Sequence, residues 1–336
     1  MRSISFRTFS GRILTPTPLA RPSPSIFVAS VDMAASAGPD AGGSPGSPPE
    51  GSAHLAAGAP AGLSGQTMIA AKPADSLILR IASSAVLGPV TIAACWAGGP
   101  AFAALVAFLM VAMCFEWTRM VERRELTPAF LALGGAGAIA IGAAAFGAFP
   151  LAYAACVIAG AAGAAFASPG VRGWCGVAAA YVLAPCVALL WLREGVENGR
   201  GLTILLFAVV WAADTGGYFF GRLVGGPRLA PILSPAKTWA GAVGGIILGG
   251  AAGLVGGRLS FGGGDELAYA GIGGALGLIS ILGDMAESGF KRHFGVKDMS
   301  GFIPGHGGAL DRLDGMIFAT SAIALIIYGH ILLARL

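Results

Sequence analysis

The sequence predicts an all-α integral membrane protein with about nine transmembrane helices and its N-terminus in the cytoplasm. Three observations carry this prediction. Apolar residues make up 55% of the 336 residues and charged residues only 11%, whereas a soluble domain carries about 25% charged residues. Apolar runs of about 20 residues, long enough for a helix to cross a bilayer, recur along most of the chain. Arginine and lysine collect in alternate loops, as in proteins that cross a membrane repeatedly.

The same composition excludes several classes of function. A chain so poor in charge cannot cover a water-soluble fold, so a cytosolic enzyme and a nucleic-acid-binding module are both excluded. The net charge of +4 is too small to imply a polyanionic partner. The five cysteines lie in apolar stretches without a C-x-x-C pair, and we interpret them as small buried hydrophobic residues.

Residues 1–74 are rich in Pro, Ser, Ala and Gly, and we expect a disordered tail ahead of a transmembrane domain at 75–336. The arginine-rich start, with no acid before Asp32, resembles an organelle transit peptide. The alternative is an over-long start with Met33 or Met68 as the true initiator, and the Ala/Gly/Pro-rich composition favours it.

The apolar runs define nine spans, and the charges define their orientation. The predicted spans are 78–97, 99–118, 127–146, 149–168, 174–192, 203–222, 237–257, 268–287 and 315–334. Proline and glycine inside them do not exclude helices, because neighbouring helices satisfy the freed backbone groups. With a cytoplasmic N-terminus and the tail left out, cytoplasmic loops and span ends hold thirteen cations and the opposite side four. An odd number of spans preserves this asymmetry.

Acidic residues inside the spans mark the candidate site. Asp214 lies in the sixth span, Asp284 and Glu287 lie near the end of the eighth, and Glu116 closes the second. All four fall toward the predicted cytoplasmic side. A carboxylate at the bilayer centre costs about 3 kcal/mol, so each should face protein or water. For Glu116, a simple pairing with Arg119 at i+3 is an equally open interpretation.

One face of the eighth span carries a stripe of polar residues at i, i+3, i+4 and i+7. They are Asp284, Glu287, Ser288 and Lys291. Further cations follow, suited either to phosphate oxygens or, alternatively, to an ordinary cytoplasmic cluster. They are Arg292, Lys297 and Arg312. Such a stripe on a membrane helix is not a packing face, so we expect a polar site at this end of the span.

A glycine-rich segment leads into the ninth span. Consecutive N–H groups, such as those of Gly307 and Gly308, suit phosphate oxygens. Asp311 and Asp314 lie on the first turn of the span, where two carboxylates fit Mg²⁺ ligation. Their alternative role is a favourable interaction with the helix dipole. His306 stands between glycines without an apolar face, so we expect no core role for it.

A second basic element opens the seventh span. Ser234 is a candidate helix cap, beside the helix-starting Pro235. Lys237 and Thr238 place a cation and a hydroxyl group at a helix N-terminus, which suits a phosphate group. The signal is weak by itself, because no P-loop pattern surrounds it.

The stretch from Ser288 to Asp314 resembles the signature of the phosphatidate cytidylyltransferase (CDP-diglyceride synthetase) family. The matching positions are Ser288, Lys291, Arg292, Lys297, Asp298, Pro304, His306, Gly307, Gly308, Asp311, Arg312 and Asp314. Ser234–Thr238, the segment around Asp214 and the pair Glu116–Trp117 resemble the family too, and the resemblance covers about residues 80–336. Ala309 departs from the pattern, where a bulkier aliphatic residue is expected.

The resemblance implies the reaction of CTP with phosphatidate to give CDP-diacylglycerol and pyrophosphate, a step of phospholipid biosynthesis. It implies catalytic roles for Asp284, Lys291, Arg292, Lys297, Asp298, His306, Asp311 and Arg312. It implies substrate binding by Ser234, Lys237, Thr238, Ser288, Gly307 and Gly308. The implied metal ligands are Asp284, Asp311 and Asp314, with Asp214 for a second cation or to orient a lysine.

We expect Mg²⁺ as the cofactor and leave a second cation open. The expected partners are CTP, phosphatidate and membrane lipid, with no nucleic acid, and a homodimer is left open. The expected location is a bacterial inner membrane with the active site facing the cytoplasm, or an organelle membrane if the arginine-rich start is real.

The sequence leaves two rival functions open. A secondary transporter for an anionic substrate also uses membrane acids and glycine-rich helices, but it predicts polar residues near the bilayer midplane and detectable halves. The sequence gathers its polar residues at one side and has no internal repeat. A CTP-dependent polyprenol kinase shares the nucleotide, and only a substrate assay separates it. A CDP-alcohol phosphotransferase would carry D-G-x-x-A-R, which is absent.

Overall fold

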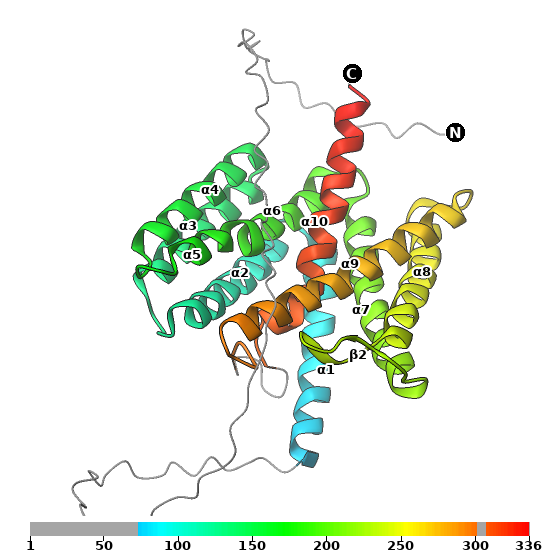
Figure 1. The fold of residues 1–336 in the computed structure, drawn as a ribbon. Coiled ribbons are helices and arrows are strands. Elements are labelled where there is room, and N and C mark those ends of the chain that lie inside the picture. Colours follow the sequence, from blue (N-terminus) through cyan, green and yellow to red (C-terminus); the bar gives the residue numbers. More distant parts are fainter. Residues whose placement is uncertain (1–72, 301–306, 336) are drawn as a thin grey trace, which may run out of the picture. The chain divides into compact units, whose positions relative to one another are not determined.

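The fold is known from a computed structural model, which describes residues 73–300 and 307–335. These residues are almost entirely helical, with one short β-hairpin (Figure 1). The expected disordered tail, 1–74, lies outside the described residues except for its last two positions, which begin the first helix.

The predicted spans each coincide with a helical segment. The long helices are α1 (Pro73–Ala97), α2 (Gly99–Glu122), α3 (Pro128–Ala145), α4 (Phe149–Phe166), α7 (Gly199–Leu223), α8 (Trp239–Phe261), α9 (Glu266–His293) and α10 (Leu310–Leu333). Within 73–300 and 307–335, eight helical segments are long and apolar enough to cross a membrane, and Ala82–Ala97 of α1 is a shorter apolar helix. The all-α polytopic membrane fold is therefore confirmed.

The fifth predicted span, 174–192, is helical but irregular. It consists of α5 (Arg172–Ala178), the π-helical η1 (Ala179–Leu183), α6 (Ala184–Leu190) and the π-helical η2 (Trp191–Gly195). Proline has no amide hydrogen, so Pro185 cannot donate to the carbonyl of Tyr181 one turn earlier. The helix widens into η1 just before this proline, and π-turns of this kind are frequent at functional sites.

Threonine and proline determine where two helices begin. Pro128 stands in the first turn of α3, and the preceding Thr127 caps that helix with its side-chain oxygen. Thr238 caps α8 in the same way, because its hydroxyl oxygen accepts the Gly241 N–H at 3.1 Å. The prediction of Ser234 as the cap was wrong, since Ser234 begins a five-residue strand that runs up to the helix.

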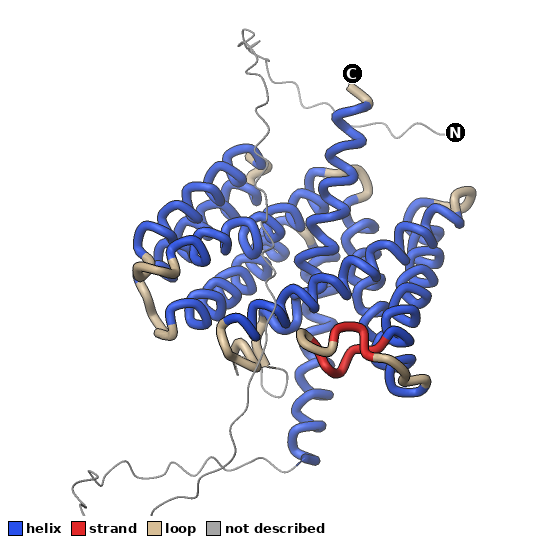
Figure 2. Tube along the Cα trace, in the orientation of Figure 1, coloured by secondary structure: helices blue, strands red, loops and turns tan. Residues whose placement is uncertain are grey.

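A short antiparallel hairpin separates α7 from α8 (Figure 2). Its strands are β1 (Arg228–Ala230) and β2 (Ser234–Thr238), with Ala230 opposite Ser234. The sequence did not predict these strands, because the Ser-Pro of β2 is also a common start of a helix. The hairpin matters for the site because β2 carries Lys237.

Candidate active site

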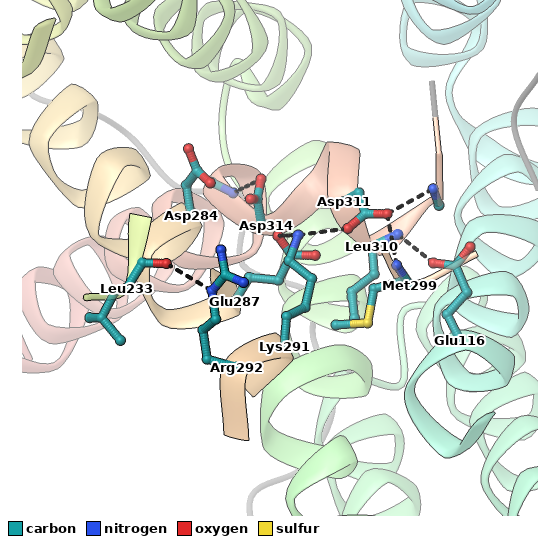
Figure 3. Close-up of polar contacts among 12 residues, drawn as sticks. Glu116, Leu233, Asp284, Glu287, Lys291, Arg292, Met299, Leu310, Asp311 and Asp314 are labelled. Carbon is teal, nitrogen blue, oxygen red and sulfur yellow. Dashed lines mark hydrogen bonds and ion pairs between the residues drawn. The ribbon is translucent and has the colours of Figure 1, made fainter. Parts of the chain in front are cut away.

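Three carboxylates from α9 and α10 meet at one place. Asp284 and Glu287 lie one turn apart on α9, and Asp314 lies on α10. One oxygen of each lies within 4.8 Å of the others (Figure 3). Glycine permits this approach, because a Cβ atom at Gly283 would lie 2.6 Å from the Asp314 carbonyl oxygen. We refer to Asp284, Glu287 and Asp314 as the acidic cluster.

One carboxylate oxygen of the acidic cluster is buried without a hydrogen-bond donor in the described part of the chain. Glu287 is 1% exposed, and its Oε1 has no hydrogen-bond partner among the described residues. Its Oε2 accepts a hydrogen bond from Lys291 Nζ at 3.1 Å. Asp314 is 9% exposed and accepts the N–H of Gly315 at 2.7 Å. A buried carboxylate oxygen without a donor is costly unless a ligand satisfies it, so the cluster has the chemistry of a cation site.

The β-hairpin supplies the first of two lysines beside the cluster. Lys237 forms an ion pair with Asp284 and donates a hydrogen bond to the Ile281 carbonyl at 3.4 Å. The neighbouring Thr238 hydroxyl is committed to capping α8. The hairpin therefore places a cation against α9, whereas Ser234 at the other end of β2 is half-buried and faces Ala230.

The second lysine links α9 to the first turn of α10. Lys291 Nζ lies 3.1 Å from Glu287 and 2.8 Å from Asp311 (Figure 3). Asp311 uses its other oxygen to accept the backbone N–H groups of Met299 and Gly308, at 3.2 and 2.9 Å. Asp311 is thus outside the acidic cluster and is held by one lysine and two backbone donors.

Glu116 of α2 also accepts hydrogen bonds from backbone amides. It is fully buried and accepts hydrogen bonds from Ser300 Oγ at 2.5 Å, Ala309 N at 2.9 Å and Leu310 N at 2.7 Å. The alternative interpretation, a pairing with Arg119, was wrong, because the Arg119 guanidinium lies 3.8 Å from Glu125 instead. The sequence did not reveal the partners of Glu116, because they lie far along the chain.

The two glycines before α10 have geometric roles. Gly307 has φ +86°, a conformation that residues with a Cβ rarely adopt. A Cβ at Gly308 would lie 2.7 Å from Glu116 Oε2, so that position has no room for a side chain. Because the Gly308 N–H already donates to Asp311, one of the two amides predicted to cradle a phosphate is used within the protein.

The remaining predicted residues that the structure describes are not members of the acidic cluster. Asp214 of α7 is exposed, and it interacts electrostatically with Asp284 and Lys237. Arg292 is exposed and donates to the Leu233 carbonyl at 3.5 Å. Ser288 is half-buried on α9, whereas Lys297, Asp298 and Arg312 are exposed. His306 lies outside the described residues.

Aromatic rings of Tyr181, Trp117, Phe290 and Phe318 pack together as an aromatic wall beside the site. Tyr181 of η1 packs on Trp117 and Phe290, with ring centroids 5.0 and 5.2 Å apart, and on Phe318 at 6.2 Å. Its hydroxyl is buried without a hydrogen-bond partner among the described residues. Phe290 and Phe318 follow Glu287 and Asp314 by about one turn, so the wall lies directly against the acidic cluster. Tyr181 was not predicted as a site residue, and its only local signal in the sequence is Pro185, four residues later.

The comparison with known families agrees with this geometry. The profile of the cytidylyltransferase family matches residues 78–330. The chain belongs to the cytidylyltransferase family. The match includes the acidic cluster, both lysines and Glu116, so every element of the site described above lies inside the family's common region.

Several bacterial relatives carry the name phosphatidate cytidylyltransferase. One from Brucella suis biovar 1 (strain 1330) is 37% identical over 265 residues, which cover 75% of this chain and 93% of that protein. One from Haemophilus influenzae is 42% identical over 139 residues, covering 40% of this chain and 46% of that protein. One from Staphylococcus saprophyticus is 38% identical over 151 residues, covering 42% and 54% respectively.

Proposed function

We propose that this chain is a phosphatidate cytidylyltransferase, which converts CTP and phosphatidate to CDP-diacylglycerol and pyrophosphate. The observation that carries the proposal is the acidic cluster between two lysines, inside a chain that aligns with 93% of a relative of that name. Polar residues concentrate at one end of apolar helices, as the joining of a lipid and a soluble nucleotide requires.

The chemistry needs charge neutralisation more than a strong base. An oxygen of the phosphatidate phosphate attacks the α-phosphorus of CTP, the bond to the bridging oxygen breaks, and pyrophosphate leaves. The attacking oxygen is already anionic at neutral pH, so the barrier comes from bringing two polyanions together in the right orientation. Lys237 and Lys291 form ion pairs with the acidic cluster, and we assign them, together with Arg292, to the phosphate oxygens.

The acidic cluster fits Mg²⁺. Carboxylate oxygens are the ligands that this ion prefers, and its sites use one or two of them together with substrate phosphates. Asp284, Glu287 and Asp314 would hold the ion, which supplies neutralisation of the CTP phosphates and of the leaving group. Asp311 was expected to ligate the same ion, but Lys291 and two backbone amides already occupy its two oxygens, so we leave it out of the proposed ligand set. We keep Asp214 as the proposed carboxylate for a second cation or for orienting Lys237.

The site lies at a membrane boundary in this proposal. Phosphatidate reaches it laterally with its headgroup at the interface, and CTP arrives from the aqueous side. The side rich in lysine and arginine is the cytoplasmic one under the positive-inside rule. We therefore propose an inner-membrane enzyme whose active site faces the cytoplasm.

The test uses the full chain in detergent with phosphatidate, Mg²⁺ and CTP labelled either in the cytidine or at the γ-phosphate. The expected result is cytidine label in the lipid fraction that depends on both phosphatidate and Mg²⁺. Transfer of γ-phosphate label to a polyprenol would make the protein a kinase. No transfer of either label by folded protein would remove the enzymatic proposal and favour a transporter.

A pair of variants near the two ends of α9 tests the site as well as the reaction. Asp284→Asn should lower the rate about 100-fold or more, since it removes a charge that acts where the phosphates meet. Asp265→Asn is the matched control, because Asp265 precedes the opposite end of the same helix and its side chain makes no cap hydrogen bond. Equal rates for the two variants would contradict the assignment of the acidic cluster.

A further inference from the structure

Glu116 and Asp311 hold the same two pieces of backbone. Ser300 and Met299 precede the segment 301–306, and Gly308, Ala309 and Leu310 follow it. Glu116 accepts hydrogen bonds from both sides, through Ser300 Oγ and the amides of Ala309 and Leu310. Asp311 does the same through the amides of Met299 and Gly308. Two carboxylates therefore determine where α10 begins.

The contacts of Glu116 are suited to orienting a helix. The N–H groups of Ala309 and Leu310 belong to the start of α10, where backbone donors lack partners within the helix. A carboxylate at that position also interacts favourably with the helix dipole. Both oxygens of Glu116 are occupied, and the side chain is 0% exposed. Glu116 therefore has no free oxygen for a substrate or a metal ion.

We propose that Glu116 is a positioning residue for the reaction: it anchors the first turn of α10 to α2, so that Asp311 faces Lys291 and Asp314 faces Asp284 and Glu287. The reference to the reaction rests on the proposed function, whereas the anchoring itself rests on the contacts. The anchoring also requires glycine at position 308, because a Cβ there would lie within 3 Å of both carboxylate oxygens of Glu116.

The first experiment measures Mn²⁺ binding to the full chain in detergent, by the electron paramagnetic resonance signal of the free ion. Glu116→Gln replaces one acceptor oxygen by an amide that faces a backbone donor. We expect the dissociation constant for Mn²⁺ to rise about 10-fold to 100-fold, the usual effect of removing a group that orients metal ligands. The matched control is Glu122→Gln on the same helix, since Glu122 accepts hydrogen bonds from Ser168 N and Oγ, away from the cluster.

The control separates positioning from stability. Both variants lose hydrogen bonds to a carboxylate of α2, so both lower the unfolding temperature. Only Glu116→Gln should change Mn²⁺ affinity. A folded Glu116→Gln protein that binds Mn²⁺ as tightly as the wild type would overturn the proposal.

A second pair of variants decides the matter if Glu116→Gln does not fold. Gly308→Ala should weaken Mn²⁺ binding strongly, because its methyl group meets the Glu116 carboxylate. Glu116→Asp shortens the acid by one methylene and makes room for that methyl group. The double variant should bind Mn²⁺ more tightly than Gly308→Ala alone, a non-additive result that identifies direct coupling. Strictly additive losses would contradict the anchoring.

The two proposals fail separately. If the wild-type chain transfers no cytidylyl group and the Mn²⁺ results hold, the assigned reaction is wrong and the anchoring stands. If the wild-type chain transfers the group and the Glu116 variants retain normal Mn²⁺ affinity, the anchoring is wrong and the reaction stands.

Discussion

Two regions of the molecule pack by different means. Helices α7, α8 and α9 contact one another largely through glycine, so that backbone lies on backbone. A Cβ at Gly273 of α9 would lie 2.7 Å from the Cα of Gly253 on α8, and one at Gly241 would lie 2.7 Å from the Gly217 carbonyl oxygen of α7. The bundle from α2 to α6 is instead filled by large side chains, with Phe102 and Leu133 almost completely buried.

The difference shows how a polar site is held in an apolar protein. Lipid offers a helix the same apolar contacts that a protein core does, so membrane helices associate through close packing and polar contacts. Glycine contacts attach α9 to α8 at a fixed distance. On another side, Phe290 of α9 packs against Trp117 and Trp174 of the side-chain bundle. Two of the three residues of the acidic cluster, Asp284 and Glu287, lie on α9, the helix that joins the two kinds of packing.

The largest effect is expected where backbone meets backbone. Gly273→Ala places a methyl group against atoms of α8 that cannot rotate away, and we expect a loss of about 3 kcal/mol of stability or no folded protein. Gly271→Ala, two positions earlier on α9, is the control, because a Cβ there meets nothing within 4 Å. The unfolding temperature of both variants in detergent checks this, and equal values would break the comparison.

A smaller effect is expected in the side-chain bundle. Leu133→Ala leaves a cavity, and we expect a loss of about 2 kcal/mol, at the low end of the range for such changes, because lipid also solvates the removed methyl groups in the unfolded reference state. A Cβ at Gly163 would lie 2.6 Å from Leu133 Cγ. Adding Gly163→Ala to Leu133→Ala should therefore recover stability, as the unfolding temperature of the double variant will show.

This rescue sharpens the contrast between the regions. Gly163→Ala alone should destabilise the protein, and the same change should stabilise it when Leu133 is already alanine. No substitution of a side chain makes equivalent room at Gly273, where the obstacle is backbone. A double variant no more stable than Leu133→Ala alone would show that the bundle cannot be repacked.

The smallest effect is expected at the surface of the side-chain bundle. Arg119 and Glu125 form an exposed ion pair at 3.8 Å, with side-chain exposures of 42% and 74%. Glu125→Gln should change stability by less than about 0.5 kcal/mol, since exposed pairs contribute little. Unfolding at low and high salt is the measurement, and a shift as large as that of Leu133→Ala would mean that surface charge, and not packing, stabilises this region.

Helix positions were predictable from the sequence because they depend on local composition. Uncharged runs of sufficient length have few alternatives to a membrane helix, and each predicted span matches one helical segment. The pairing of Asp284 with Glu287 was also visible, since residues at i and i+3 share a face. Asp314 was predicted to lie near Asp284 because it stands at the start of the ninth span, on the same side of the membrane as the end of the eighth.

The partners of the polar residues were not predictable by the same means. Glu116 meets Ala309 and Leu310 only because α2 and α10 pack together, and no local pattern encodes that contact. One oxygen of Asp311 accepts the amides of Met299 and Gly308, and the other contacts Lys291. These contacts decide whether Asp311 can bind a metal ion, and they depend on how the fold brings the segments together. The β-hairpin was missed because its strands are short and its second strand contains Pro235.

The placement of glycines opposite large side chains has a consequence for how such sequences diverge. Gly163 lies beneath Leu133, and Gly244 beneath Phe220, each leaving no space for another carbon atom. A lineage that acquires a side chain at either glycine must shorten the opposing residue. Side-chain size should therefore covary among related chains between positions 133 and 163 and between positions 220 and 244. Gly253 and Gly273 should not covary with any side chain, because each faces backbone.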